Sequence, residues 1–400
     1  MEPMKRILNR DHILIQTAFY ICFAALMGFG TFTMLSRGYN ASTIGVLIAL
    51  ANLSSIVFNY LISALQGKLK TVSVFQMAFF VSLALLAAYI GNALCARPSF
   101  ALSLSYLLCI AFTFSLTPLI DSLNSALIKN GIDIHFGVAR SFGSLSYGIS
   151  CIVFGYIASA AGWQAIVWLL VLFHLVLIFF LYISGRHFAR IDTAEAGEEE
   201  KETLHFLEFI KNRPSFFLTC IGYAGLMGCF NLIMESFLLP ILLSVGGTTV
   251  DSGIVQGIKA FMEVPFIFCF HLIERRFSLR SIFTVSVFSF FAKCLIMYAA
   301  RTVVPIYASQ ILQGTSLALL LPAYVSYINR TMKKNEIALA YALQAMSLTA
   351  VQMLLNSFGG YVLDLYGVKP LCMLAAVLTA LSGYLLLRHL RPADTAKQTV

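Results

Sequence analysis

The sequence predicts an all-α membrane protein of about twelve transmembrane helices, arranged as two pseudo-repeats of six spans with both termini in the cytoplasm. The first observation behind this prediction is composition. Of the 400 residues, 59% are hydrophobic and only 11% are charged, whereas soluble proteins carry about 25% charged residues. The second is the spacing of the apolar runs, and the third is the placement of basic residues between them.

The apolar runs come first along the chain. A bilayer core about 30 Å thick needs about 20 apolar residues in a helix, and in hydrocarbon such runs must be helical because an open strand leaves its backbone donors unpaired. The sequence contains about twelve of them. They lie near residues 12–36, 42–66, 72–95, 99–128, 138–161, 163–185, 214–245, 252–273, 281–300, 303–329, 336–365 and 369–389.

The connections between these runs set the orientation. With both termini on one side, 20 of the 27 Lys and Arg residues fall on that side and three fall within spans. Only Arg37, Arg97, Arg301 and Lys369 fall on the other. Basic loops stay in the cytoplasm, so both termini are predicted to be cytoplasmic. The net charge of +9 is explained by topology, and we expect no nucleic-acid partner.

One connection is long and polar, and it divides the spans six and six. It contains the acidic residues Glu198, Glu199, Glu200 and Glu202, which are typical of a solvated linker. We therefore expect an N-terminal six-helix bundle over 1–185, a cytoplasmic linker over 186–213, and a C-terminal bundle with a short tail over 214–400.

The two halves show weak internal similarity. The segment "FGYIASAAGW" at 154–163 matches "GGYVLDLYGV" at 359–368 at an offset of 205 residues. The prolines of "SLTPLIDSLN" and "LLLPAYVSYIN", Pro118 and Pro322, are 204 residues apart. Agreement of the two offsets indicates parallel repeats.

The nine cysteines have no CxxC spacing and mostly lie within apolar runs. This pattern indicates neither a disulfide framework nor a zinc site. We expect no metal and no cofactor, with a proton gradient as the energy source.

Charged side chains within the spans are the main candidate functional residues, because an ionisable group at bilayer depth is costly unless it is paired or faces water. Helical rise places Asp121 and Arg140 in the cytoplasmic halves of consecutive spans. They can pair there, or Arg140 can extend to the interface.

The same estimate places Glu263 and Lys293 near mid-membrane on the eighth and ninth spans, where they form either a structural bridge or a proton-coupling pair. Lys259 lies one turn from Glu263 and can compete for it. In the seventh span, Glu235 shares a predicted helical face with Asn231. These two either line a cavity or pack as a polar stripe on a neighbour.

Two regions carry a resemblance to a known family. The segment "PLIDSLNSALIKNGIDIHFGVARSFGSLSYG" at 118–148 resembles the fourth and fifth spans of the lactose permease-like branch of the major facilitator superfamily. That branch includes nucleoside and phenylpropionate permeases. The segment "GIKAFMEVPFIFCFHLIERRF" at 257–277, followed by Lys293, is similar to the eighth and ninth spans of the branch.

The resemblance implies the major facilitator fold, with substrate bound between two six-helix halves. It also implies that Arg140 and Glu263 line the substrate cavity, with Asp121 as the acidic partner of Arg140, and that the chain is a monomer. Tyr147, on the glycine-rich fifth span, is a further candidate for contacting substrate. The tenth span departs from the family pattern: "SQILQGTS" at 309–316 offers glutamines such as Gln313 where sugar permeases carry a histidine and a glutamate.

The predicted function is secondary active transport of a small organic solute of the sugar, nucleoside or aromatic acid class, by alternating access and proton symport. The expected location is the plasma membrane of a bacterium. Efflux of drugs or sugars by the same fold is the alternative. A polytopic enzyme or a sensor is disfavoured, since no GxSxG or HExxH motif is present. Glu263, Lys293, Lys259 and Gln313 are the candidate proton-coupling residues.

Overall fold

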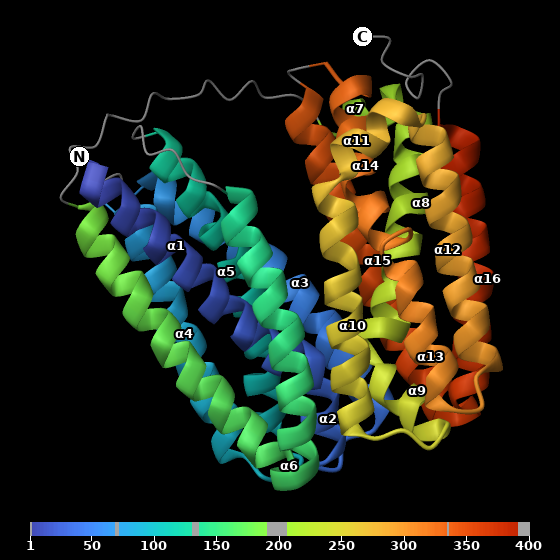
Figure 1. Ribbon diagram of the computed structural model, residues 1–400, viewed down its shortest axis with the longest axis horizontal. Helices are drawn as coiled ribbons and strands as arrows, with labels where there is room; N and C mark the ends of the chain where they lie inside the picture. The colour runs from blue at the N-terminus through green and yellow to red at the C-terminus, as the bar shows by residue number, and fades with distance from the viewer. Residues whose placement is uncertain (1, 69–71, 130–135, 190–205, 334–335, 391–400) are drawn as a thin grey trace. The chain divides into compact units, whose positions relative to one another are not determined.

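The computed structural model describes residues 2–68, 72–129, 136–189, 206–333 and 336–390, and those residues are helical with short connections. The chain divides into two compact units (Figure 1). The first consists of residues 1–198 with 252–257, and the second of residues 199–251 with 258–400. The domain boundaries predicted from the sequence, at 186 and 213, stay a prediction.

The first unit opens with a helix that is interrupted by a short π-helix. Its elements are α1 (Glu2–Phe23), η1 (Ala24–Gly28), α2 (Phe29–Leu35), α3 (Ala41–Lys68), α4 (Val74–Leu94), α5 (Phe100–Lys129) and α6 (Phe136–Phe188). Helix α1 packs along α6, while α5 packs against both α3 and α4.

The second unit has more interruptions. Its elements are α7 (Phe206–Asn212), α8 (Pro214–Asn231), η2 (Leu232–Ser236), α9 (Leu238–Ser244), α10 (Thr249–Phe268), α11 (Phe270–Arg276), α12 (Leu279–Ala299), α13 (Val303–Ser309), η3 (Gln310–Gln313), α14 (Leu317–Thr331), α15 (Ile337–Tyr366) and α16 (Val368–His389). Helix α8 packs against α15 and α16, and α12 packs against α14 and α16.

The prediction of about twelve spans agrees with these helices. Among the described residues, ten helices are long and apolar enough to cross a membrane, and a bent pair, α10 with α11, makes an eleventh. Gly162 breaks α6 with φ 74° and ψ −171°, so this 53-residue element consists of two spans and the total becomes twelve. The orientation of the termini stays a prediction.

Backbone conformation supports the internal repeat more sharply than the sequence does. Gly367, between α15 and α16, has φ 82° and ψ −169°, which matches Gly162 at the offset of 205 residues already seen in the sequence. Gly38 and Gly246, the other two glycines with positive φ among the described residues, are 208 positions apart.

The two π-helices, η1 and η2, are also 208 positions apart. Each ends at a phenylalanine with nearly the same backbone angles: φ −125° and ψ 4° at Phe29, φ −124° and ψ 20° at Phe237. The first and seventh spans therefore share an interruption at equivalent positions.

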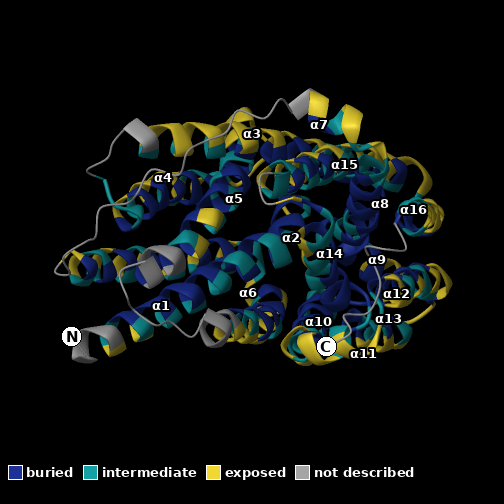
Figure 2. Cartoon of the chain, turned by 90° about the horizontal axis from the view of Figure 1, so that it is seen from above, coloured by how far each residue is buried: buried dark blue, intermediate teal, exposed yellow. Residues whose placement is uncertain are grey.

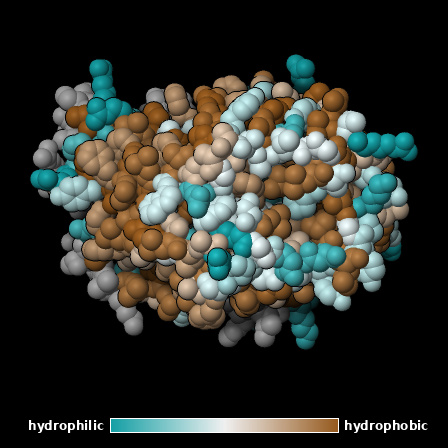
Figure 3. Space-filling model, turned by 90° about the horizontal axis from the view of Figure 1, so that it is seen from below, coloured by the Kyte–Doolittle hydropathy of each residue, from teal (hydrophilic) through white to brown (hydrophobic). Residues whose placement is uncertain are grey.

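The surface of the helices fits a lipid environment. Large apolar side chains such as Phe100, Tyr60 and Leu354 are exposed. Hydrophobic residues also cover much of the face that Figure 3 shows from below, where the helices end. Figure 2 shows that the buried residues lie where helices of a unit face one another. A chain with this distribution has hydrocarbon outside and packed helices within.

Close helix packing depends on small residues. A Cβ at Gly222 of α8 would lie 2.6 Å from the backbone nitrogen of Leu386 and 2.8 Å from the carbonyl oxygen of Ser382, both on α16. In the first unit, a Cβ at Gly143 of α6 would lie 2.6 Å from the ring of Tyr20. Small residues let membrane helices approach in this way, as the glycine-rich fifth span suggests.

Candidate functional site

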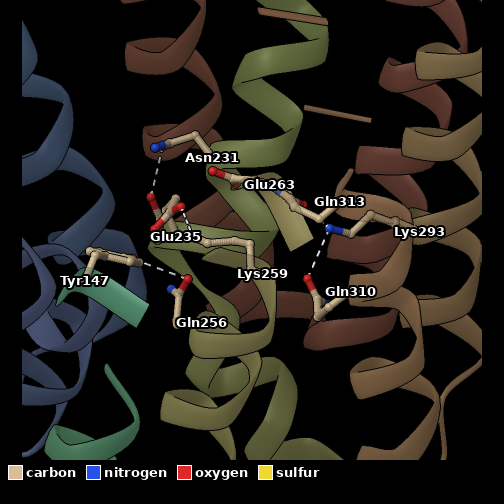
Figure 4. Close-up of polar contacts among 10 residues, drawn as sticks. Tyr147, Asn231, Glu235, Gln256, Lys259, Glu263, Lys293, Gln310 and Gln313 are labelled. Carbon is tan, nitrogen blue, oxygen red and sulfur yellow. Dashed lines mark hydrogen bonds and ion pairs between the residues drawn. The ribbon is translucent and has the colours of Figure 1, made fainter. Parts of the chain in front are cut away.

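A cluster of charged and amide side chains lies inside the second unit (Figure 4). Its members come from α8, η2, α10, α12, η3 and α15, and we call them the charged cluster. They are Asn231, Glu235, Ser236, Lys259, Glu263, Lys293, Gln310, Gln313 and Asn356.

Irregular backbone carries three of these side chains into the cluster. Glu235 belongs to the π-helix η2, and Gln310 and Gln313 belong to the 3₁₀ segment η3. π-Helical turns and short 3₁₀ segments inside a helix are frequent at functional sites. A third break follows Glu263 on α10, because α10 and α11 meet at an angle of 55° after Pro265.

The first ion pair joins Lys259 to Glu235. The Lys259 ammonium donates to Oε1 of Glu235 (Figure 4), and the two side chains are 5% and 21% exposed. The sequence suggested that Lys259 competes for Glu263, one turn away on the same helix. In the structure Lys259 forms an ion pair with the carboxylate of the π-helix, and its charge also acts on Glu263.

The second ionic connection is indirect. Nε2 of Gln313 donates to Oε1 of Glu263 at 2.7 Å, and Oε1 of Gln313 accepts from the ammonium of Lys293. Gln310 also accepts from this ammonium, at 3.1 Å. The predicted Glu263–Lys293 bridge is therefore an amide-mediated contact. The glutamines of the tenth span, which depart from the family pattern, provide the link.

An aromatic ring lies near both ammonium groups. The centroid of the Phe230 ring is 5.6 Å from Nζ of Lys259 and 5.7 Å from Nζ of Lys293. A cation within about 6 Å of a ring face is attracted by its quadrupole. With two carboxylates and two ammonium groups, the cluster carries no net charge when all four are ionised.

Asn231 lies in an amide network next to the ion pair. Nδ2 of Asn356 donates to Oδ1 of Asn231 at 3.1 Å, and the hydroxyl of Ser236 lies 3.2 Å from the same oxygen. The predicted common face of Asn231 and Glu235 assumes an α-helix. Since residues 232–236 are π-helical, Ser236, five residues on, stands next to Asn231 instead.

Sequence reasoning did not select Asn356, Ser236 or Phe230. Asn356 could have been predicted as a site residue, because it is an amide within the largely apolar run "VQMLLNSFGG". Phe230 could not, since it is one of 34 phenylalanines.

The candidate residues of the first unit are less fully described. Tyr147 is buried on α6, with its ring 6.1 Å from that of Phe23. Asp121 is exposed on α5. Arg140 is part of helix α6, but its side chain is outside the described residues, so the Asp121–Arg140 pair stays a prediction.

A buried arginine that the sequence placed in an outer loop stabilises the first unit. The Arg37 guanidinium donates to the carbonyl of Asn92 and to its side-chain oxygen, both at 2.9 Å, and lies 4.3 Å from the ring centre of Trp163. Burial lowers the pKa of Arg37 to about 10, so it stays charged at neutral pH. Its contacts join α4 and α6 to the end of α2.

Two further ion pairs lie at the predicted cytoplasmic end of the second unit. Arg213 contacts Glu336 at 2.7 Å, and Arg330 contacts Glu274 at 2.6 Å. Burial alone would raise the pKa of Glu336, but the backbone N–H of Lys333 and the Arg213 guanidinium outweigh it and hold that pKa below its ordinary value. The first pair links the starts of α8 and α15.

No group of three His, Cys, Asp or Glu side chains that could hold a metal ion occurs within the described ranges. The charged cluster instead combines fixed cations, carboxylates and amides. These groups can bind a polar solute or exchange a proton.

Comparison with known proteins assigns the family. The family model described as "MFS_1 like family" matches residues 13–380. The chain belongs to this family of major facilitator transporters. A relative that matches most of this chain is the "Uncharacterized transporter YwbF" of Bacillus subtilis (strain 168), which is 23% identical over 408 residues, 94% of this chain and 96% of the relative.

Solved structures share the fold of this MFS_1-like protein. A mutant of the nucleoside transporter NupG has a TM-score of 0.81 at 13% identity, covering 96% of this chain and 100% of that one. A bacterial homologue of the human lysosomal transporter Spinster has a TM-score of 0.68 at 13% identity, with both chains covered completely. The resemblance to major facilitator transporters that the sequence shows is confirmed.

Proposed function

We propose that this multi-pass membrane protein is a secondary active transporter that moves a small organic solute by alternating access, coupled to protons in symport. The observation that carries the proposal is the charged cluster of the second unit, whose two lysines are buried and whose two half-buried carboxylates have different settings. One is neutralised directly by an ammonium, and the other contacts a neutral amide.

Glu263 is the better proton carrier of the two carboxylates. Glu235 contacts the Lys259 ammonium directly, so protonation of Glu235 breaks an ion pair whose ammonium is buried, at a large cost. Glu263 contacts the amide of Gln313. An amide N–H can donate to either the ionised or the protonated acid, and therefore Glu263 can change its protonation state without losing this contact.

The solute class is a sugar, a nucleoside or an aromatic acid. Asn231 and Glu235 of the second unit, and Arg140, Asp121 and Tyr147 of the first, are the proposed substrate contacts. Amide and carboxylate groups suit the hydroxyls of a sugar or nucleoside, while the Arg140 guanidinium suits a carboxylate or a hydroxyl. NupG is named as a nucleoside transporter, which makes nucleosides the first solutes to test.

The remaining proposals concern the setting of the protein. It works as a monomer in the plasma membrane of a bacterium, with lipid as its surroundings, a small molecule as its partner and the proton gradient in place of a cofactor. No enzymatic step is required for this activity.

The test is substrate-induced proton uptake by purified protein in proteoliposomes. An internal pH dye reports acidification of the lumen on addition of uridine, lactose or phenylpropionate, each tested singly. We expect at least one of them to acidify the lumen with wild type, and the Glu263→Gln variant to lose this signal while retaining exchange of the labelled solute. If no solute moves protons while an unlabelled one still accelerates exchange, proton symport is wrong.

A further inference from the structure

Lys293 is a fully buried ammonium whose close partners are neutral. The residue is 1% exposed, and no carboxylate of the described residues lies within 4.0 Å of its Nζ. Its hydrogen bonds go to the side-chain oxygens of Gln310 and Gln313. A buried charge normally has an opposite charge beside it, so the negative charge that balances Lys293 must act from farther away.

The ammonium fixes the orientation of both amides. A lysine ammonium has donors only, so each glutamine must turn its oxygen toward Lys293 and its NH₂ group away. The NH₂ group of Gln310 then donates to the carbonyl of Ile306 and the hydroxyl of Ser309, each at 2.9 Å. Gln310 is thus anchored on its own segment of chain.

Gln313 differs from Gln310 in the partner of its NH₂ group. That group donates to Oε1 of Glu263 at 2.7 Å, while its oxygen accepts from Lys293. The amide dipole of Gln313 thus points its positive end at the carboxylate and its negative end at the ammonium. Hydrogen bonds aligned in such a chain strengthen one another. Gln313 is fully buried, so water does not weaken this alignment.

The three members come from three consecutive spans. Glu263 lies on α10, Lys293 on α12, and Gln313 on η3, the 3₁₀ break between α13 and α14. Gly314, the next residue, packs so closely on Phe266 of α10 that a Cβ there would overlap the ring. A change in the Glu263–Gln313 contact therefore acts on a part of the tenth span that is already interrupted.

We propose that Gln313 is a positioning residue that links the protonation state of Glu263 to the placement of the η3 segment, through its two-sided contact with Glu263 and Lys293. When Glu263 is ionised, its negative charge balances Lys293 through the aligned amide and holds η3 against α10. When Glu263 takes up a proton, its contact with Gln313 remains but loses its charge. The hydrogen-bond partners of Lys293 are then all neutral, the other charges that act on it are those of the Lys259–Glu235 pair, and the hold on η3 weakens. This inference rests on the proposed function of Glu263 as the proton carrier.

The test compares Gln313→Leu with Gln310→Leu. Both variants remove an oxygen acceptor from Lys293, but only Gln313→Leu also removes the donor to Glu263. In proteoliposomes, the pH profile of solute-induced proton uptake is measured with the solute from the set above that acidifies the lumen with wild type. Loss of the hydrogen bond from Gln313 to ionised Glu263, together with the link to the Lys293 charge, shifts the midpoint of the pH profile by about one pH unit or more.

We expect the midpoint of the Gln313→Leu profile to move upward by about one pH unit, because the ionised acid loses its donor, and the number of protons taken up per solute to fall. Gln310→Leu lowers the rate but keeps the wild-type midpoint. A third variant, Gln313→Glu, keeps an oxygen against Lys293 but places a second acid beside Glu263, and it also moves the midpoint upward.

A Gln313→Leu profile with the wild-type midpoint and stoichiometry, in protein that elutes as wild type on size exclusion, overturns the proposal. So does an equal shift in Gln310→Leu, since that result assigns the effect to Lys293 alone. If Gln313→Leu does not fold, the comparison of Gln313→Glu with wild type decides in the same way. If wild-type protein takes up no protons with any solute, the proposed function fails, whereas coupling that depends on Glu263 but not on Gln313 removes only this inference.

Discussion

At the scale of single residues, depth along a helix is predictable but the choice of partner is not. Helical rise placed Glu263 and Lys293 near the same level, and both belong to one cluster. The partner of Lys259 depends on how α10 is rotated and on which side chain the seventh span presents. That information lies in tertiary packing, and for this reason Lys259 contacts Glu235 although Glu263 is its neighbour in sequence.

Asn231 shows a second reason why side-chain partners are hard to predict from the sequence. One extra residue per turn rotates the following side chains by about 100°. The π-helix η2 makes this change between Asn231 and Glu235. Its sequence, "LIMES", contains no proline or glycine from which the change could be predicted. A helical face drawn across such a turn is therefore wrong by about one residue.

The Arg213–Glu336 pair gives a prediction that depends on pH. Since the pKa of Glu336 in the folded protein is below the ordinary value of 4.5, the stabilisation is complete above about that pH and is lost as the pH falls through the folded value. We expect Glu336→Gln to lower the midpoint of thermal unfolding by about 1–2 °C at pH 7. The difference from wild type disappears in strongly acidic buffer.

The measurement is intrinsic fluorescence of detergent-solubilised protein heated at a series of pH values. Glu208→Gln, at an exposed carboxylate of α7, is the matched control and shifts the midpoint little at any pH. A Glu336→Gln difference of constant size from neutral to acidic pH is incompatible with this interpretation of the pair.

At the scale of helices, the spans follow from apolar run length, because a bilayer demands about 20 apolar residues whatever the tertiary structure. Breaks within the spans are harder to predict from the sequence. The bend between α10 and α11 has a sequence cause in Pro265, whereas η2 and η3 have no proline. The sequence therefore predicts the bend of the eighth span at Pro265. It also predicts bends at Pro240 in the seventh span and Pro322 in the tenth, but η2 and η3 lie before those prolines.

The contact between α8 and α16 gives a prediction at this scale. In Gly222→Ala, the new methyl group meets backbone atoms of Leu386 and Ser382, which no side-chain rotation can relieve. We expect a loss of about 1–3 kcal/mol in stability, seen as a lower midpoint of thermal unfolding.

Gly91→Ala on α4 is the control for this variant. The nearest atom to its new Cβ, Cβ of Ser105, is 3.6 Å away, which is ordinary contact, and alanine favours a helix over glycine by about 1 kcal/mol. Its midpoint stays the same or rises. Equal midpoints for the two variants would mean that α8 and α16 are not packed as closely as described.

At the scale of the whole molecule, the sequence predicts the fold class and the repeat, and the structure adds the conformational evidence for the repeat. Glycines with positive φ and π-helices recur at offsets of 205 and 208 residues. The two halves differ in chemistry at the equivalent interruption. In η1 the sequence is "AALMG", and in η2 it is "LIMES" with Glu235.

This difference locates the buried ion pair in one half of the repeat. Glu235 occupies the position that Met27 occupies in the first unit. The same π-helical turn therefore carries a charge in one unit and an apolar side chain in the other. Within the proposed function, proton coupling is therefore a property of the second unit.

The most direct test of proton-coupled transport is accumulation of the labelled solute in wild-type proteoliposomes with an imposed pH gradient. With the lumen alkaline, we expect the solute to rise above its external concentration, because protons flowing inward carry it with them, and to fall back when a protonophore is added. A solute that reaches only its external concentration with or without the gradient contradicts proton coupling. Accumulation only when the lumen is acidic contradicts symport and indicates exchange of solute for protons, as in an exporter.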